Sequence, residues 1–311
     1  MISDRLMSRP APLALAVLFG ALAACLLWAY WPVLGRMAHT WLHDPQYSHA
    51  YLVPVFAAYL LWRRRDRLGD ITLRYHRGGL PLLGAGVLLW LAGAYLYLDW
   101  FEAVSLLVTL AGCAVLLGGR LALGWSWPAI AFLIFMVPLP HQVEVALAHP
   151  LQRVATVAGT YTLQTIGVPA LAEGNVILLT DGRMGVEEAC GGLSMLLTFF
   201  ALAAGLAILI RRPLWEKLVL VASAIPIALA ANVIRIAVTG VLHETAGPEL
   251  ARAVFHDLAG WFMMPLALVL LWLELVLLSS LVVETGELQP VPLAVPKPAP
   301  ARSSPRQHAG V

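Results

Sequence analysis

A polar loop gives way to an apolar segment within Gly185-Val186-Glu187-Glu188-Ala189-Cys190-Gly191-Gly192-Leu193, and the apolar sequence continues to Ile210. The stretch 193–210 carries no charged residue and is long enough to cross a bilayer as a helix. Cys190 therefore lies at the mouth of a membrane helix, an unusual position for a purely structural cysteine. Whether it acts as a nucleophile depends on which other side chains reach the same depth.

Composition sets the fold class. Of the 311 residues, 60% are hydrophobic and 12% are charged. A soluble domain of this length cannot bury so much apolar surface, so we expect an all-α polytopic membrane protein. The three cysteines, Cys25, Cys113 and Cys190, lack the spacing of metal ligands, which argues against a zinc site or a disulfide scaffold. We expect no metal, no cofactor and no nucleic-acid partner.

Hydropathy divides the chain into about eight transmembrane helices. The predicted spans are residues 12–33, 50–62, 79–98, 103–117, 125–137, 193–210, 218–238 and 256–283. The longest region between spans, residues 141–188, has two parts. Mixed three and four spacing of apolar residues over 143–166 predicts a helix at the periplasmic interface. The β-branched, turn-bounded segment 175–182 predicts a short strand or hairpin. We expect one transmembrane domain over 1–283 and a disordered, Pro-rich cytoplasmic tail over 284–311.

The distribution of basic residues predicts the orientation. An even number of spans puts both termini on one side, and fifteen of the twenty Lys and Arg fall on that side of the bilayer. By the positive-inside rule both termini are cytoplasmic. We expect the chain to lie in a bacterial inner (cytoplasmic) membrane. Cys190 then begins its helix on the periplasmic side. The next span runs outward and places Arg235 near its periplasmic end. The last span begins at His256 on the periplasmic side and runs inward.

Three residues from three helices are therefore expected at one depth. His256 can accept the proton of the Cys190 thiol and later protonate a leaving amine. Arg235 can stabilise an acyl oxyanion. Asn232 lies three residues before Arg235 on the same helical face and can orient a partner. Glu188 can orient His256.

Each of these residues also has a simpler interpretation. A cysteine at a helix end can be a packing residue, and Arg235 can be an anchor that extends to the interface. His256 can cap the last helix. Glu187 and Glu188 can be a solvated helix entrance that interacts favourably with the helix dipole.

Motifs along the chain resemble those of the exosortase/archaeosortase family of membrane cysteine transpeptidases. The resemblance runs from about Trp41 to Met264, and its motifs occur in the family's order. They are residues 41–65, 135–140, Gly174-Asn175, Glu188-Ala189-Cys190-Gly191-Gly192, Asn232-Val233-Ile234-Arg235 and 256–261. One departure is Gly192, where many relatives have serine, and we expect this change to be tolerated.

The resemblance implies Cys190 as nucleophile, with Arg235 and His256 as its catalytic partners. It also implies the substrate: an exported protein with a C-terminal sorting signal made of a short motif such as Pro-Glu-Pro, a membrane helix and a basic tail. Such a substrate presents its motif just outside the bilayer. The polar segment that contains Tyr47, Ser48 and His49 is then expected to help bind the substrate, although these residues can also simply cap the second span.

Two other functions fit the sequence. A transporter or exopolysaccharide-export component can use Arg235 to bind an anionic substrate, with Cys190 incidental. The lack of an internal repeat argues against a transporter, whereas Pro226 inside the seventh span favours one. A non-catalytic scaffold for assembly in the lipid bilayer is the third possibility.

Overall fold

The computed structural model describes residues 12–70, 74–180, 182–186, 192–247, 249 and 259–281. The elements in chain order are α1 (Pro12–His43), η1 (Pro45–Tyr51), α2 (Leu52–Arg63), η2 (Arg65–Asp70), α3 (Gly79–Leu96), α4 (Asp99–Phe132), η3 (Leu133–Met136), α5 (His141–Thr165), β1 (Ala170–Glu173), β2 (Val176–Leu179), β3 (Gly182–Gly185), α7 (Gly192–Leu209), α8 (Leu214–Ala246) and α10 (Ala259–Leu281). Cys190, Glu188, His256 and the predicted tail 284–311 lie outside the described residues.

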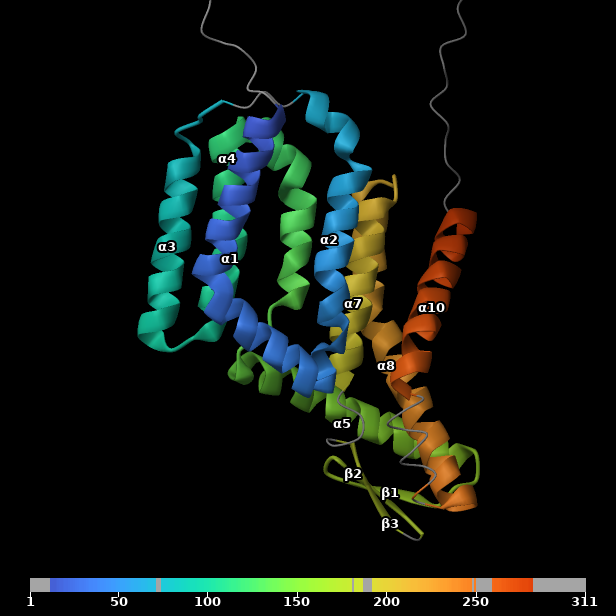
Figure 1. Ribbon diagram of the computed structural model, residues 1–311. Helices are drawn as coiled ribbons and strands as arrows, with labels where there is room; N and C mark the ends of the chain where they lie inside the picture. Colours follow the sequence, from blue (N-terminus) through green and yellow to red (C-terminus); the bar gives the residue numbers. More distant parts are fainter. Residues whose placement is uncertain are drawn as a thin grey trace, which may run out of the picture.

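Apolar helices form a membrane bundle, as composition predicts (Figure 1). Within the described part of the chain, five segments are long and apolar enough to cross a bilayer. They are Phe19–His43, Gly79–Leu96, Asp99–Met136, Gly192–Leu209 and Leu214–Ala246. The shorter α2 and the described part of α10 run alongside them (Figure 1). The polytopic helical fold is therefore confirmed, and the count of eight spans stays a prediction.

The segment Asp99–Met136 is a helical hairpin. Gly119 has φ 62° and ψ −153°, a conformation that favours glycine, and the chain turns back on itself there (Figure 1). A Cβ at Gly119 would also lie 2.8 Å from Nε2 of His76. The two predicted spans 103–117 and 125–137 thus lie on either side of this turn. The first half packs closely on α3, where glycines repeat at every seventh position along one face: Gly79, Gly86 and Gly93.

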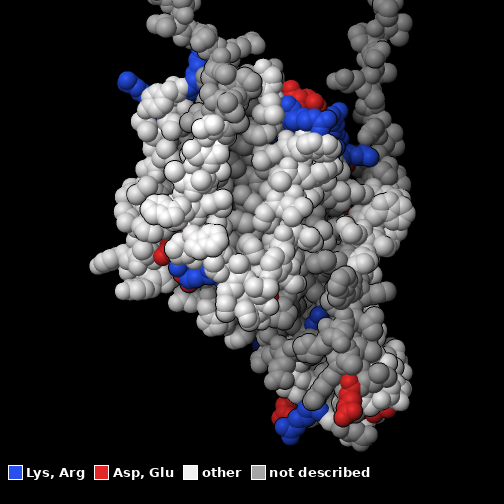
Figure 2. All heavy atoms as spheres, in the orientation of Figure 1, with Lys and Arg blue, Asp and Glu red and all other residues white. Residues whose placement is uncertain are grey.

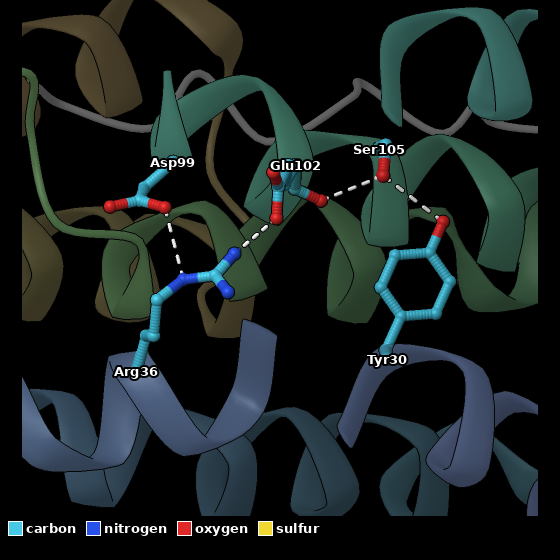
Figure 3. Close-up of polar contacts among 5 residues, drawn as sticks. All are labelled: Tyr30, Arg36, Asp99, Glu102 and Ser105. Atoms are coloured by element: carbon cyan, nitrogen blue, oxygen red, sulfur yellow. Dashed lines mark hydrogen bonds and ion pairs between the residues drawn. The ribbon is translucent and has the colours of Figure 1, made fainter. Parts of the chain in front are cut away.

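Helix α1 is longer than predicted. The predicted span ends at residue 33, but the helix continues to His43, because no residue breaks it before Pro45. Pro32 lies inside α1, and the helix bends as it leaves the bundle axis (Figure 1). The extension also has a charged contact. Arg36 forms ion pairs with Asp99 and Glu102 at the start of α4, with Nε of Arg36 3.0 Å from the Asp99 carboxylate (Figure 3).

A buried hydroxyl network continues this contact between α1 and α4. The Tyr30 hydroxyl lies 3.0 Å from Oγ of Ser105 and 2.9 Å from Oγ1 of Thr109. Oγ of Ser105 in turn donates to the Glu102 carbonyl oxygen at 2.7 Å (Figure 3). Polar groups buried in a membrane protein need such partners. The network therefore holds α1 on α4 at the end of the bundle where α5 lies.

Helix α5 and a small sheet cover that end. Helix α5 runs across the ends of the bundle helices (Figure 1), and its bounds confirm the helix predicted over 143–166. The predicted strand or hairpin is a three-stranded antiparallel sheet in the order β1-β2-β3. Strands β2 and β3 fall in or beside the predicted segment, whereas β1 was not predicted. A Gly174-Asn175 turn joins β1 to β2, with Gly174 at φ 62°.

Helix α8 extends beyond the bundle to support this sheet. It runs to Ala246, eight residues past the predicted span (Figure 1). Oε1 of Glu244 accepts a hydrogen bond from the Thr180 backbone N–H at 2.8 Å. On the bundle side, α8 packs against α7 and α10 around the fully buried Phe199 and Leu220. The sheet is thus attached to the same helix that carries Asn232 and Arg235.

Candidate functional site

The first turn of α7 packs directly against α8 and α5. Gly192 is buried, and a Cβ at this position would lie 3.1 Å from Nδ2 of Asn232 and 3.9 Å from Cβ of Leu151. Even a Cβ would press on the Asn232 amide, so glycine permits the close approach. The residue that follows the Cys190-Gly191 pair therefore touches the helix that carries Arg235.

Asn232 is the most unusual polar side chain of this region. It is 1% exposed, and within the described residues neither Nδ2 nor Oδ1 has a hydrogen-bond partner. Burial of an unpaired amide costs on the order of 1–3 kcal/mol in proteins, so such groups are rare. The amide is available to a group that approaches from the loop before α7 or from a substrate.

Arg235 follows Asn232 by three residues on the same helical face. Its side chain is half-buried, and its Nε atom is buried. The sequence predicts Arg235 near the outer end of its span. Instead α8 continues for eleven residues beyond it, a rise of about 16 Å. Arg235 therefore lies within the helix, at the level where the bundle meets α5.

Helix α5 and the sheet form the second wall. Nδ2 of Asn175 donates to Oε1 of the buried Gln152 at 3.1 Å. The backbone N–H of Val186 donates to the Asn175 carbonyl oxygen at 2.8 Å. These bonds attach the chain entering the 187–191 loop to α5. Sequence reasoning missed Gln152, because a single glutamine in an amphipathic helix carries no pattern, whereas Asn175 belongs to the Gly174-Asn175 motif.

Segment η1 packs on the opposite side of α7. Oγ of Ser194 donates to the Gln46 carbonyl oxygen at 3.5 Å, and Oγ1 of Thr198 lies 3.3 Å from Nδ1 of His49. The Tyr47 hydroxyl accepts a hydrogen bond from the Leu139 N–H at 3.0 Å. Tyr47 and His49 are buried and Ser48 is exposed. Two of the three residues predicted to bind substrate thus hold η1 in place, and only Ser48 faces outward.

Burial of His49 makes the stability of the folded protein depend on pH. Removal from water lowers the pKa of His49, and hydrogen bonds to the backbone of Phe135 and Gln46 oppose this shift. The unfolded chain therefore takes up the proton first, at its ordinary pKa of about 6.5, and the folded protein loses stability as pH falls through that value.

We expect the thermal unfolding temperature of the detergent-solubilised protein to fall between pH 7.5 and pH 5.5, and to fall less in His49→Gln. Each unit by which the pKa is lowered corresponds to about 1.4 kcal/mol. The exposed His141 serves as the control, since His141→Gln should keep the wild-type pH dependence. Equal pH dependence in the wild type and His49→Gln would contradict this assignment.

The unpaired amide of Asn232 predicts a trade-off between stability and activity. We expect Asn232→Leu to raise the free energy of unfolding by about 1–2 kcal/mol, because leucine removes an unpaired buried amide. We expect the same substitution to lower the activity of the site at least about tenfold, because a functional partner is lost. Chemical denaturation and an activity assay on the same preparation measure both effects.

Thr160 offers a matched control. Its Oγ1 is also buried without a partner among the described residues, and it belongs to α5. Thr160→Val should stabilise the protein with no loss of activity. A destabilised Asn232→Leu would show that the amide is structural, and a fully active one would show that the site does not use it.

Comparison with known proteins identifies the family. A family model for the transmembrane exosortase matches residues 41–273, about three quarters of the chain. The chain belongs to the transmembrane exosortase family. The match confirms the resemblance drawn from the motifs, and it covers η1, α5, the sheet, α7 and α8, the elements of the candidate site of this exosortase. No curated protein and no solved structure gave a significant match.

Proposed function

We propose that this exosortase is a membrane cysteine protease/transpeptidase that cleaves the C-terminal sorting signal of exported proteins through a thioacyl intermediate. The observation that carries the proposal is the packing of Gly192 on Asn232. Cys190 is two residues before Gly192, so the covalent chain keeps their Cα atoms within about 7 Å. Arg235 is one helical turn from Asn232. This short connection allows the thiol to approach the guanidinium, which supports the proposal.

The register of α10 on α8 supports a role for His256. Oγ of Ser223 donates to Oε2 of Glu274 at 2.5 Å, which pairs these two antiparallel helices. Arg235 lies twelve residues after Ser223 in α8. Because the helices are antiparallel, the residue opposite it in α10 lies twelve residues before Glu274, at position 262 near the start of α10. His256 precedes the first described residue of α10 by three positions. Six residues separate His256 from residue 262, and a chain segment of that length can bring the imidazole to Arg235.

The proposed reaction has two steps. His256 accepts the proton of Cys190 while Sγ attacks the carbonyl carbon of the scissile peptide bond, and Arg235 stabilises the resulting oxyanion. Collapse of this intermediate breaks the C–N bond, and His256 returns its proton to the leaving amine. The thioester that remains is then cleaved by water or by an acceptor amine. A Cys190 thiolate also gains from the positive dipole at the start of α7.

The remaining predicted residues take supporting roles in this proposal. Asn232 orients the nucleophile loop or the substrate through its amide, and Glu188 orients His256. Tyr47 and His49 act from buried positions by holding η1 against Leu139 and α7, respectively, whereas the exposed Ser48 is available to a substrate. Residues of α5 and the sheet would cover the substrate's motif.

The charges favour the proposed orientation. Basic residues gather at the end of the bundle away from α5: at the end of α2, before α3, at the turn of α4 and after α7 (Figure 2). The positive-inside rule puts this end in the cytoplasm, so that α5, the sheet and Arg235 face the periplasm of an inner membrane. A substrate anchored by its own membrane helix then presents its motif beside the start of α7.

Co-expression tests the proposal. An exported reporter ending in a Pro-Glu-Pro motif, a membrane helix and a basic tail should lose its helix and tail when wild-type protein is present, and mass spectrometry of the reporter should find a single new C-terminus. A transporter or an assembly scaffold would leave the reporter intact. An uncleaved reporter, together with uncleaved native candidates that carry such signals, would overturn the proposal.

A further inference from the structure

We propose that the bundle end away from α5 carries a binding site for one anionic phospholipid. The site is a cleft of about 730 Å³, and we call it the basic cleft. It lies between the ends of α2 and α7, the second half of α4 and the start of α8. This inference is independent of the proposed protease activity, because it concerns the opposite end of the molecule.

Positive charge surrounds the mouth of the basic cleft. Five basic residues and a single acidic one, Asp66, line it. The basic residues are Arg63, Arg64, Arg67, Arg211 and Lys217. Nη2 of Arg64 donates to the Gly124 carbonyl oxygen at 3.0 Å, which ties α2 to α4. None of the ion pairs found among the described residues involves any of the five, so this excess of positive charge is not neutralised by the protein.

The interior of the basic cleft is apolar. Alanines on facing helices, Ala131 of α4 with Ala204 and Ala207 of α7, leave a gap that no larger side chain fills. The gap extends from Trp127 in α4 to Phe135 in η3, a rise of about 13 Å. Phe135 lines the gap at its deep end, and its ring centroid lies 5.8 Å from that of Phe200. A hydrocarbon chain has the shape and polarity to fill this gap.

The combination of these two parts selects the ligand. A soluble anion would use the basic mouth but leave the apolar gap empty, and a neutral lipid would use the gap but not the charge. Basic pockets between helices on the cytoplasmic side of a bilayer suit lipids with phosphate headgroups. A substrate with a basic tail is excluded by repulsion. A phosphatidylglycerol-like lipid, with one phosphate and two acyl chains, satisfies both parts of the basic cleft.

The test measures lipid binding by the full chain purified in a mild detergent. Dioleoylphosphatidylglycerol and dioleoylphosphatidylcholine are titrated separately, and the bound fraction is read by native mass spectrometry and by thermal unfolding. We expect the glycerol lipid to bind at least about tenfold more tightly than the choline lipid and to raise the unfolding temperature. Inorganic phosphate alone, at the same concentration, should have neither effect.

Two sets of four substitutions test the charges at equal net charge. The cleft set changes Arg63, Arg67, Arg211 and Lys217 to glutamine, and the control set changes Arg65, Arg74, Arg77 and Arg120, which lie at the same end outside the cleft. We expect binding of the glycerol lipid to weaken about fivefold for each cleft cation removed, since each cation near an anionic headgroup contributes about that factor. The control set should bind as the wild type does.

A third variant tests the apolar gap. Ala131→Trp fills the gap while every cation remains, and Ala131 is exposed, so the fold should tolerate the ring. We expect Ala131→Trp to lose the preference for the glycerol lipid over the choline lipid. The control, Ala85→Trp on the exposed side of α3, should keep this preference. Equal binding of the two lipids, equal loss in both charge sets, stabilisation by phosphate alone, or unchanged binding in Ala131→Trp would each overturn the proposal.

Discussion

Replacement of Cys190 with alanine is expected to lower the rate of reporter processing by at least about a thousandfold, because the nucleophile is lost and no other thiol can replace it. Cys190→Ser should be nearly as inactive, since a hydroxyl is a poorer nucleophile and its proton is harder to remove. Both variants should keep the expression level and unfolding temperature of the wild type, because alanine and serine are small enough to occupy the position. Time courses of reporter cleavage in membranes measure the rate.

The chain provides its own controls for this experiment. It has only two other cysteines, the exposed Cys25 in α1 and the half-buried Cys113 in α4. Cys25→Ser and Cys113→Ser should process the reporter at the wild-type rate. A wild-type protein stopped during turnover should carry reporter mass that hydroxylamine removes, as expected of a thioester, and Cys190→Ala should carry none. Normal cleavage by Cys190→Ala would end the enzyme proposal.

The second large effect concerns the shape of the cation at position 235. Arg235→Lys keeps the positive charge but loses the planar guanidinium that can donate two parallel hydrogen bonds. If Arg235 stabilises the oxyanion, we expect kcat to fall by about 10²–10³, with a much smaller change in KM, since the interaction forms mainly in the transition state. Initial rates measured over a range of reporter concentrations separate the two constants.

The same substitution at an exposed arginine is the control. Arg153 lies on the exposed face of α5, and Arg153→Lys should leave both constants unchanged. An Arg235→Lys protein that keeps the wild-type kcat would limit Arg235 to an anchoring or general electrostatic role. A fall in unfolding temperature that matches the loss of activity would instead assign Arg235 to the structure of α8.

Local sequence determined the membrane class and most of the elements. Hydropathy identified α3, α7 and both halves of α4, because a helix in a bilayer must be apolar over its whole length whatever its neighbours are. Amphipathic spacing identified α5, and the order of the motifs identified the family. Each of these signals is a pattern of residues that lie close together in the chain, so it can be recognised without knowing the tertiary structure.

Tertiary structure decided which surfaces meet. No local pattern pairs Gly192 with Asn232, Asn175 with Gln152, or His49 with Thr198, because each contact joins segments far apart in the chain. The lengths of α1 and α8 were also decided this way. Arg36 and Glu244 are charged residues that would end a membrane span by composition, yet each lies inside a continuous helix and has a partner on another element. Hydropathy reports only what a residue loses by leaving water, whereas the partner of a polar or charged side chain is known only once the chain has folded.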